Sequence, residues 1–388
     1  MKILVLGAGR MGFAAVQDLA RTGRAIELGV GDIDISRARS IAKKGGASAA
    51  HKVDVTRVDE LAEILRGYDA LINACWYEFN LHVMKACLKS GCQYNDLGGL
   101  FHMTRRQMAL DMEFKKRGIS AVIGGGESPG ITNMMCALAA ANLDAVERIR
   151  IFAGAREAPR RRDGGLIFPF SVSTVVDEYS KNPVQYLNGR YVEMEPMSGK
   201  EIVKFPMPVG KNKCYYSLHS EQATLPRTIG GVKTVEFKLG ISDSFARILR
   251  PLIELGLTSE KKVPVDGTEI SPKHFLVSFL NLRTRDADEL KRSVALRTVV
   301  AGTRGRKGVT LVHDMVSAPR PSMGMNNATA YLTGVASSIF GQFLASGKVE
   351  EKGVLPPERA VDPRLFMHEL KMREIAVAER EIRAERGP

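Results

Sequence analysis

The sequence predicts an α/β protein with an N-terminal, doubly wound parallel sheet and a second, α+β domain with a mostly antiparallel sheet. Over residues 1 to about 125, short apolar runs alternate with segments whose apolar residues have helical spacing. Such alternation builds a parallel sheet with helices on both faces, and right-handed crossovers make it doubly wound. After Gly130 the apolar residues of several runs alternate with polar ones, which is typical of strands with one face in water.

The apolar runs of the first half have the length of buried strands. They are Ile3–Leu6, Ile26–Val30, Leu71–Ala74 and Ala121–Ile123. The helical segments between them are Met11–Ala20, Arg37–Lys43, Val58–Leu65, Leu81–Leu88 and Met108–Lys116. Asn80 is placed to cap the fourth of these helices, and Gly91 is placed to end it.

The second half mixes strands with fewer helices. The predicted strands are Val146–Phe152, Thr234–Lys238, Leu296–Ala301 and Val309–Val316, and the predicted helices are Ser244–Leu255, Pro272–Asn281 and Asn327–Leu344. A glycine-rich loop at 302–308 joins the last two strands as a hairpin. The tail Asp362–Arg386 mixes Glu with Lys and Arg, as exposed helices do. We expect domains at 1–128, 129–325 and 326–388.

Charge and composition exclude several classes of protein. The 388 residues carry a net charge of +13, but the basic clusters at 115–117 and 160–162 have no aromatic residues between them. We therefore expect no nucleic-acid partner, and an anionic substrate or cofactor accounts for the charge equally well. Five cysteines without a CxxC pair argue against disulfides and zinc.

No targeting or membrane segment is evident in the sequence. The longest apolar run, Met134–Ala141, is too short to span a bilayer, so we expect a cytoplasmic protein with no membrane partner. His51, His82 and His102 lack metal-ligand spacing with cysteines or carboxylates, so we also predict no metal.

The strongest single signal is the glycine motif that follows the first strand. Gly7, Gly9 and Gly12 form GxGxxG between a predicted strand and a predicted helix, which is the setting of a Rossmann dinucleotide-binding turn. Gly7 permits the tight turn, Gly9 lets the pyrophosphate approach, and Gly12 lets the helix pack closely. The helix start at Arg10 and Met11 then presents backbone amides to the phosphates.

Asp32, 25 residues after Gly7, ends the next strand. A carboxylate there accepts hydrogen bonds from the ribose hydroxyls of NAD and repels the 2′-phosphate of NADP, so we predict NAD, with NADP less favoured. Capping of the next helix suits Asp34 or Ser36 better than Asp32. A flavin would also fit such a domain, but no second dinucleotide motif accompanies the first. We assign Asp54, Cys75 and Gly98 to the same cofactor site.

Further motifs, in this order, resemble those of saccharopine reductases and L-lysine 6-dehydrogenases over most of the chain. Beside the glycine motif they are Tyr77–Asn80, Asp96–Gly99, Ser128–Ile131, Phe170-Ser171 and Gly353–Glu358. The resemblance implies reversible oxidation of an amino acid at a C–N bond with a nicotinamide cofactor. It also implies a homodimer, with the C-terminal segment packed on the first domain.

The sequence departs from this family at three places on the substrate side. Members often carry an acidic residue where Gly124–Gly126 stands here, with Glu127 displaced by three residues. Ala153–Ala155 replaces a Cys-Gly-Gly, and 239–243 replaces an Arg-Tyr-x-Gly-His. The resemblance therefore leaves the substrate open among lysine, saccharopine, carboxynorspermidine and other amino-acid imines.

Two residues that follow strands at the ligand-binding edge are the catalytic candidates. Tyr77 is placed to hold the reacting nitrogen or relay its proton, and it could instead pack between the domains. Asp96 is placed to act as a base or as counter-ion to a substrate amine, and it could instead be a turn acceptor. Trp76 is expected to wall the pocket.

Substrate contacts are assigned to Glu127, Arg156 and His219. Glu127 suits a cationic amine or, equally, a solvated carboxylate in a loop, and His219 suits a proton carrier or a structural hydrogen bond. Arg156, with the cluster at 160–162, could bind the carboxylates of a larger substrate such as saccharopine, but the proline and glycine around these residues favour a basic surface loop. A different class of protein stays open as well, a dinucleotide-binding sensor without catalysis.

Overall fold

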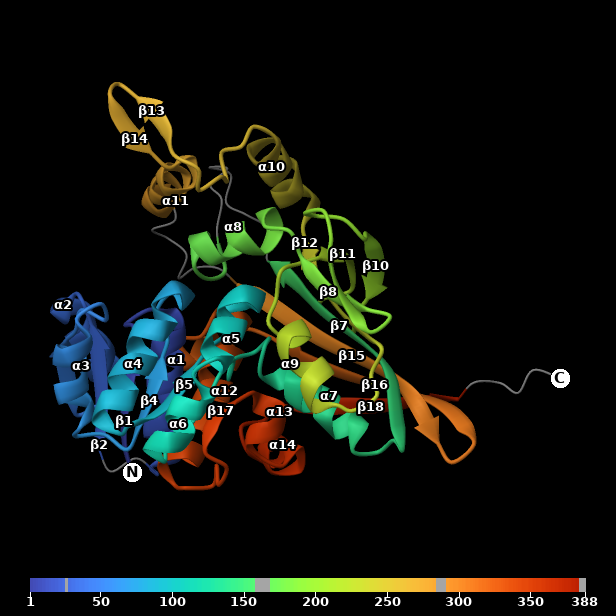
Figure 1. The fold of residues 1–388 in the computed structure, drawn as a ribbon, viewed down its shortest axis with the longest axis horizontal. Coiled ribbons are helices and arrows are strands. Elements are labelled where there is room, and N and C mark those ends of the chain that lie inside the picture. The colour runs from blue at the N-terminus through green and yellow to red at the C-terminus, as the bar shows by residue number, and fades with distance from the viewer. Residues whose placement is uncertain (25–26, 158–167, 284–290, 384–388) are drawn as a thin grey trace.

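The computed structural model of the chain describes residues 1–24, 27–157, 168–283 and 291–383, and it contains two main sheets (Figure 1). The first sheet carries the N-terminal half with helices on both faces. The second sheet forms the other half, and a helical arm projects beyond it (Figure 1). The α/β class and the parallel sheet followed by a mixed-sheet domain are confirmed.

The first sheet is parallel throughout and has the order β17-β6-β5-β4-β1-β2-β3. Its strands are β1 (Lys2–Leu6), β2 (Glu27–Asp32), β3 (Ala49–Lys52), β4 (Ala70–Asn73), β5 (Gln93–Asp96), β6 (Ser120–Val122) and β17 (Gly353–Leu355). Its helices are α1 (Arg10–Thr22), α2 (Ile35–Gly45), α3 (Val58–Leu65), α4 (Asn80–Ser90), α5 (Leu100–Met108) and α6 (Asp111–Arg117). The order reverses between β1 and β4, and ligands of such sheets bind at this point.

The second sheet is antiparallel except at one pair, β7 (Ala145–Glu157) beside β12 (Thr234–Ile241). Its other strands are β8 (Val184–Leu187), β9 (Arg190–Glu193), β10 (Glu201–Lys204), β11 (Lys211–Tyr216), β15 (Arg292–Arg304), β16 (Lys307–Ser317) and β18 (Val377–Arg383). The predicted hairpin is present as β15–β16. Its turn is tighter than expected, because Arg304 already pairs with Lys307.

A buried helix, α12 (Ala328–Ala345), connects the two halves at the predicted position. It packs on α1, β4 and β5 of the first half and on β15 of the second. A Cβ added to Gly334 would lie 2.4 Å from the Cβ of Ala14, so only glycine permits this approach of α12 to α1. In the described part of the chain, no helix has both the length and the hydropathy needed to cross a bilayer.

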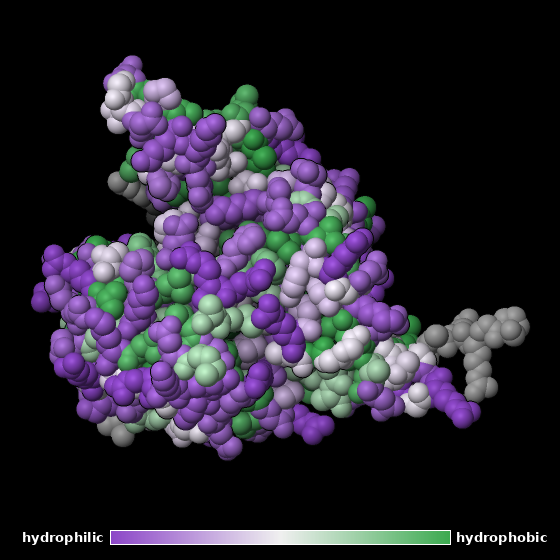
Figure 2. Space-filling model, in the orientation of Figure 1, coloured by the Kyte–Doolittle hydropathy of each residue, from purple (hydrophilic) through white to green (hydrophobic). Residues whose placement is uncertain are grey.

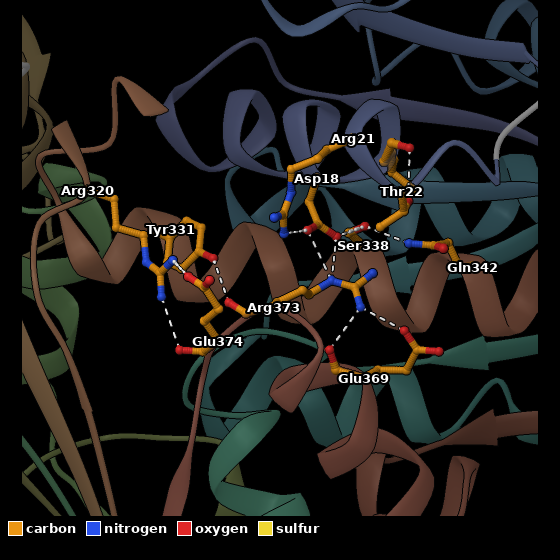
Figure 3. A network of polar contacts seen from close by, with 11 residues as sticks. Asp18, Arg21, Thr22, Arg320, Tyr331, Ser338, Gln342, Glu369, Arg373 and Glu374 are labelled. Atoms are coloured by element: carbon orange, nitrogen blue, oxygen red, sulfur yellow. Dashed lines mark hydrogen bonds and ion pairs between the residues drawn. The ribbon is translucent and has the colours of Figure 1, made fainter. Parts of the chain in front are cut away.

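The C-terminal segment returns to the first half, where buried ion pairs between side chains hold it. Arg373, which is 2% exposed, donates from Nε to Asp18 of α1 and from Nη1 to Glu369 of α14 (Pro363–Lys371) (Figure 3). Ser338 of α12 also donates to Asp18 over 2.7 Å. One buried cluster therefore joins α1, α12 and the end of the chain.

Two local predictions are wrong. The tail is not one exposed helix: it contains α14 and then β18, which pairs antiparallel with β16. Two charges of β18 contact the neighbouring strands, Glu379 with His313 at 2.8 Å and Glu381 with Arg304 at 2.9 Å. Asn80 does not cap α4, because Phe79 holds the cap position and the Asn80 amide turns inward to Asp96. Gly91 does end α4, in the left-handed conformation with φ +87.

The arm consists of α10 (Asp243–Glu254), the hairpin β13 (Val263–Val265) and β14 (Thr268–Ile270), and α11 (Pro272–Arg283). Helix α11 of the arm contacts α8 (Val172–Ser180), and the arm projects away from both sheets at the top of the view in Figure 1. A notch separates the arm from the first domain in the space-filling view (Figure 2). The division into residues 1–128, 129–325 and 326–388 stays a prediction.

Candidate functional site

The glycine turn opens the site at the carboxyl end of β1. Gly7 has φ +95, and an added Cβ would lie 2.8 Å from the carbonyl carbon of Ala74. A Cβ on Gly12 would lie 1.9 Å from the Gly7 oxygen, whereas a Cβ on Gly9 would meet no atom within 4 Å. Gly7 and Gly12 therefore fix the turn. Gly9 borders free space at the start of α1, which is the cradle that a pyrophosphate requires.

A cavity of about 690 Å³ extends from this turn to the second sheet. Eight of the predicted site residues line it. Five were assigned to the cofactor, namely Gly9, Arg10, Met11, Cys75 and Gly98. Three were assigned to the substrate or to catalysis, namely Tyr77, Glu127 and His219. Residues that were not predicted also line it, among them Arg37, Phe168, Phe237, Glu178 and Arg292. Trp76 walls the cavity as expected, and its buried indole N–H has no hydrogen-bond partner among the described residues.

One carboxylate and one guanidinium lie beside the turn, where the adenosine part of a dinucleotide is expected to bind. Asp32 accepts hydrogen bonds from the backbone N–H of Ala8 at 2.7 Å and of Asp34 at 2.9 Å. Arg37 of α2 lines the cavity and donates to the Ala8 carbonyl over 3.4 Å. An acid at this place is typical of NAD sites, and an arginine nearby accommodates the 2′-phosphate of NADP. Asp34, not Asp32, caps α2, as predicted.

Asp54 and Asp96 are not among the cavity-lining residues. The Asp54 carboxylate accepts from the N–H and the hydroxyl of Thr56, which lowers its pKa and holds it in the loop before α3. Asp96 is 1% exposed and accepts five hydrogen bonds. Its donors are Asn80, Tyr94, Gly98, Gln107 and Gly124. Asp96 therefore organises the sheet edge, and its position does not support the predicted role as a base.

Tyr77 lines the cavity, but its hydroxyl donates a hydrogen bond to a residue of the second domain. It donates to Oδ2 of Asp177 on α8 over 2.7 Å, and Lys273 of α11 contacts Oδ1 of the same carboxylate at 2.6 Å. Burial and the neighbouring Asp177 raise the pKa of Tyr77 well above its usual value. This hydrogen bond joins the first domain, α8 and the arm, which agrees with the packing role considered for Tyr77.

Asp177 also belongs to the one group of carboxylates in the described ranges that is close enough to hold a metal, together with Glu78 and Glu260. Lysine side chains already form ion pairs with two of these carboxylates. Lys273 contacts Glu260 at 2.8 Å as well as Asp177, and Lys181 contacts Glu260 at 3.1 Å. We therefore assign no metal to this group.

Two buried carboxylates face the cavity without being satisfied. Glu127 and Glu178 are 7% and 4% exposed, and Oε1 of the first and Oε2 of the second have no hydrogen-bond partner among the described residues. Burial raises the pKa of Glu127 to about 8 and that of Glu178 to about 7. Buried unpaired carboxylates are costly, so this pair is typical of a site for a cationic ligand.

His219 stands beside these carboxylates in a fixed orientation. Its ring stacks on Phe237 with 3.9 Å between the centroids, and its Nδ1 lies 2.5 Å from Oε2 of Glu221. Its Nε2 lies 3.9 Å from Glu178. Burial lowers the pKa of His219, but the charge and the hydrogen bond of Glu221, together with the charges of Glu178 and Glu127, outweigh burial, so the pKa is raised overall. His219 thus presents Nε2 towards the cavity, as a proton carrier requires.

Arg156 lines a second cavity, of about 740 Å³, and not the first. The two cavities adjoin, because both are lined by Pro169, Phe170, Glu178, Leu239 and Arg292. Arg156 donates to the Pro208 carbonyl over 3.2 Å. The companion cluster Arg160, Arg161 and Arg162 lies outside the described residues.

Sequence reasoning missed Glu178 and Arg292. The signal for Glu178 was its place in the segment 172–180, where Asp177 and Glu178 are the only charges in an otherwise apolar and hydroxyl-bearing helix. Arg292 begins β15, donates to Glu157 at 2.7 Å and to Thr329 at 3.2 Å, and is 12% exposed in its side chain. Its importance depends on tertiary contacts, and no local pattern marks it.

Comparison with known proteins bears on both halves of the chain. The family model described as saccharopine dehydrogenase NADP binding domain matches residues 3–122, and the saccharopine dehydrogenase C-terminal domain model matches residues 126–375. A carboxyaminopropylagmatine dehydrogenase of Synechocystis is 24% identical, with 95% of each chain covered. A carboxynorspermidine synthase of Vibrio alginolyticus is also 24% identical, covering 95% of this chain and 94% of the relative.

Solved structures show the same fold. The saccharopine dehydrogenase (L-Glu forming) of Saccharomyces cerevisiae superposes with a TM-score of 0.74 at 18% identity, over 98% of this chain and 99% of the other. A homospermidine synthase of Legionella pneumophila, solved with NAD, superposes with a TM-score of 0.69 at 13% identity, over 100% and 94%.

Proposed function

The chain belongs to the saccharopine dehydrogenase family and is an NAD(P)-binding oxidoreductase of that family, and we propose that it makes or breaks a C–N bond in a polyamine-type secondary amine. The observation that carries this proposal is the pair Glu127 and Glu178. Each has a buried carboxylate oxygen that no residue in the described part of the chain contacts by a hydrogen bond, and both line the cavity that starts at the glycine turn. Ammonium groups of a polyamine would satisfy both oxygens through charge-assisted hydrogen bonds.

The proposal replaces lysine metabolism, which the resemblance had suggested, with polyamine chemistry. The curated relatives that span 95% of this chain are named for a carboxyaminopropyl agmatine and for a carboxynorspermidine, both of which are carboxylated polyamines. The sensor alternative has no observation in its favour, because the cavity joins the cofactor turn to acid–base groups.

The cofactor fits the turn, and its nicotinamide would supply or accept the hydride when bound. Gly9 leaves room for the pyrophosphate, which the first backbone amides of α1, at Arg10 and Met11, would bind. Cys75 and Gly98 line the cavity deeper along the sheet edge. We propose these contacts, together with Asp32 at the ribose, as the cofactor site.

The remaining groups bind the substrate and exchange a proton with its reacting nitrogen. Glu127 and Glu178 hold ammonium groups, and the Trp76 N–H offers one donor to the ligand. The reacting nitrogen must exchange a proton during C–N chemistry, and Nε2 of His219 is the group in the cavity that is oriented for it, since Glu221 holds Nδ1. Phe168 and Phe237 give the cavity part of its apolar wall.

A substrate panel tests the proposed function. Purified protein is given NAD or NADP with carboxynorspermidine, carboxyaminopropylagmatine, saccharopine or lysine, and absorbance at 340 nm is followed. We expect reduction of the cofactor with at least one carboxylated polyamine, at a kcat/KM at least about tenfold above that for lysine, which corresponds to about 1.4 kcal/mol. Equal or better turnover of lysine would contradict the polyamine assignment.

The adenosine end allows a separate test of the cofactor. An Arg37→Ala variant is expected to weaken NADP binding by about tenfold with little effect on NAD, because only NADP carries the 2′-phosphate that a guanidinium binds. Asp32→Ala is expected to weaken NAD more than NADP. The affinities are measured by calorimetry, with Arg39→Ala, an exposed arginine of the same helix that does not line the cavity, as the matched control. Equal losses for both cofactors in both variants would contradict these roles.

A further inference from the structure

Helix α8 carries two consecutive carboxylates that lie in different surroundings. Glu178 lines both cavities, whereas Asp177 is fully buried and lines neither. Asp177 accepts from the hydroxyl of Tyr77 over 2.7 Å, and Nζ of Lys273, on helix α11 of the arm, lies 2.6 Å from its other oxygen. The two carboxylates share one helix of 9 residues, so a displacement of α8 that moves Asp177 moves Glu178 as well.

Lys273 supplies a buried cation from the arm. Its side chain is 1% exposed, although the arm projects from the rest of the molecule (Figure 1). Lysines are almost never fully buried unless they are paired, and Lys273 pairs with Glu260 at 2.8 Å as well as with Asp177. Lys181 also lies 3.5 Å from Asp177, but its side chain is 36% exposed, so water screens its charge more strongly. The arm therefore provides the better-shielded counter-charge of Asp177.

Groups on several elements determine the charge beside Glu178. They are Asp177 on α8, His219 before α9, Glu221 at the start of α9, Arg292 on β15 and Glu127 after β6. Burial raises the pKa of Glu178 to about 7, the charges of Asp177 and Glu221 add to this effect, and those of His219 and Arg292 counteract it. Because the counter-charge of Asp177 comes from the arm, the arm influences the carboxylate in the cavity.

We propose that Asp177 and Lys273 are positioning residues for Glu178. Their ion pair holds α8 between the first domain and the arm, and it balances the charge next to the carboxylate that binds the amine. The inference rests on the proposed function, in which Glu178 holds an ammonium group of the substrate. The arm thus takes part in substrate binding, and it also contributes Asn281 to the wall of the first cavity.

The nearest alternative is an ion pair that only attaches the arm to α8. Two observations favour the larger role. Tyr77, which lines the first cavity, donates to the same carboxylate as Lys273 does, and the charge of Asp177 acts directly on Glu178. A mere attachment would affect the stability of the fold and leave the titration of Glu178 unchanged.

Two variants that remove opposite charges test the inference. Lys273→Met leaves Asp177 without its buried cation, and Asp177→Asn leaves Lys273 without its buried anion. Isotope-labelled glutamate carboxyl carbons are titrated by NMR in the full-length protein, and the signal that is absent in Glu178→Gln identifies Glu178. We expect its titration midpoint to rise by about one pH unit in Lys273→Met and to fall by about one in Asp177→Asn. A unit charge at about 10 Å has an effect of this size at an effective dielectric constant of about 20.

Binding of the triamine norspermidine, measured by calorimetry on cofactor-loaded protein at about pH 7, connects this titration with the substrate. About half of Glu178 is ionised there in wild type and about a tenth in Lys273→Met, so affinity should fall about fivefold. Lys273→Arg keeps the charge and should keep the wild-type midpoint. Lys262→Met removes an exposed lysine of the arm that lines neither cavity, and this matched control should change neither quantity.

The outcomes separate the inference from the function on which it rests. If neither variant moves the midpoint, or if both move it in the same direction, the ion pair does not act on Glu178 and the inference is wrong, whatever the substrate is. If Lys273→Met does not fold, Asp177→Asn, which strands no buried carboxylate, decides by the direction of its change. If the midpoints move as expected but norspermidine does not bind cofactor-loaded wild type, the proposed function fails while the role of the ion pair stands.

Discussion

A Glu178→Gln variant is expected to lose about 100-fold or more in kcat/KM for a carboxylated polyamine while it keeps its affinity for the cofactor. Glu178 is 4% exposed and has one carboxylate oxygen without a partner at the cavity. Removing one member of a buried, hydrogen-bonded charge pair costs about 2–5 kcal/mol, and each 1.4 kcal/mol is a factor of ten. Steady-state kinetics and calorimetry with the cofactor measure the two quantities.

Glu254→Gln is the matched control for this variant, because Glu254 is also on a helix, α10, but is exposed and lines neither cavity. It should keep wild-type kinetics within about twofold. If Glu178→Gln does the same, Glu178 does not hold an ammonium group, and the main support for the polyamine substrate is lost.

The pH dependence of amine binding adds a readout that a purely structural role of Glu178 would not change. Burial raises the pKa of Glu178 to about 7, although the charges of His219 and Arg292 counteract it, and Asp177 and Glu221 add to it. Only the ionised carboxylate attracts an ammonium, and the terminal amines of norspermidine, which resemble the lysine side chain, stay protonated below about pH 9. Affinity for norspermidine should therefore fall as the pH drops below about 7. In Glu178→Gln the fall in affinity near pH 7 should be absent. The fall that comes from protonation of Glu127, whose pKa is about 8, should remain.

The sequence was sufficient for the fold and for the cofactor turn because both are local patterns. The strand–helix alternation predicted the parallel sheet, and the spacing of Gly7, Gly9 and Gly12 predicted the turn. The short strand β3 was missed, because its four residues, Ala49–Lys52, carry no apolar run. The tail was misjudged for a different reason: its charges suggested a solvated helix, but in β18 Glu379 and Glu381 contact His313 and Arg304 of the same sheet.

The substrate side was less predictable, because its residues meet only in three dimensions. Glu127 and His219 were chosen from their local chemistry and do line the cavity. Asp96 was chosen on the same kind of argument, but five donors from separate segments use up its carboxylate. Glu178, Arg292 and Glu221 gain their significance from one another across α8, β15 and α9 (Glu221–Thr228), and no spacing along the chain indicates such a group.

Arg373→Leu is expected to lower the free energy of unfolding by about 3–5 kcal/mol. Arg373 is 2% exposed, and its removal leaves the carboxylates of Asp18 and Glu369, 3% and 5% exposed, buried without their shared cation (Figure 3). Losing one partner of a buried ion pair has a cost of this size. Urea titration followed by circular dichroism measures it.

Arg24→Leu is the control, because Arg24 contacts the same Glu369 at 2.8 Å but its side chain is 47% exposed, and exposed pairs contribute at most about 1 kcal/mol. The double variant Asp18→Leu with Arg373→Leu should be less destabilised than the sum of the single variants, because it removes one of the stranded charges. If Arg373→Leu is no less stable than Arg24→Leu, the buried cluster does not hold the C-terminal segment to α1.

The same variant separates support of the fold from support of the site. Asp18 lies in the second half of α1, whereas the cofactor cradle is at the helix start, at Gly9 and Arg10. No contact of Arg373 in the described part of the chain reaches that turn. Below the urea concentration that unfolds it, Arg373→Leu should therefore bind the cofactor within about twofold of wild type. A larger loss in the folded variant would mean that the C-terminal segment positions the cradle as well as stabilising the fold.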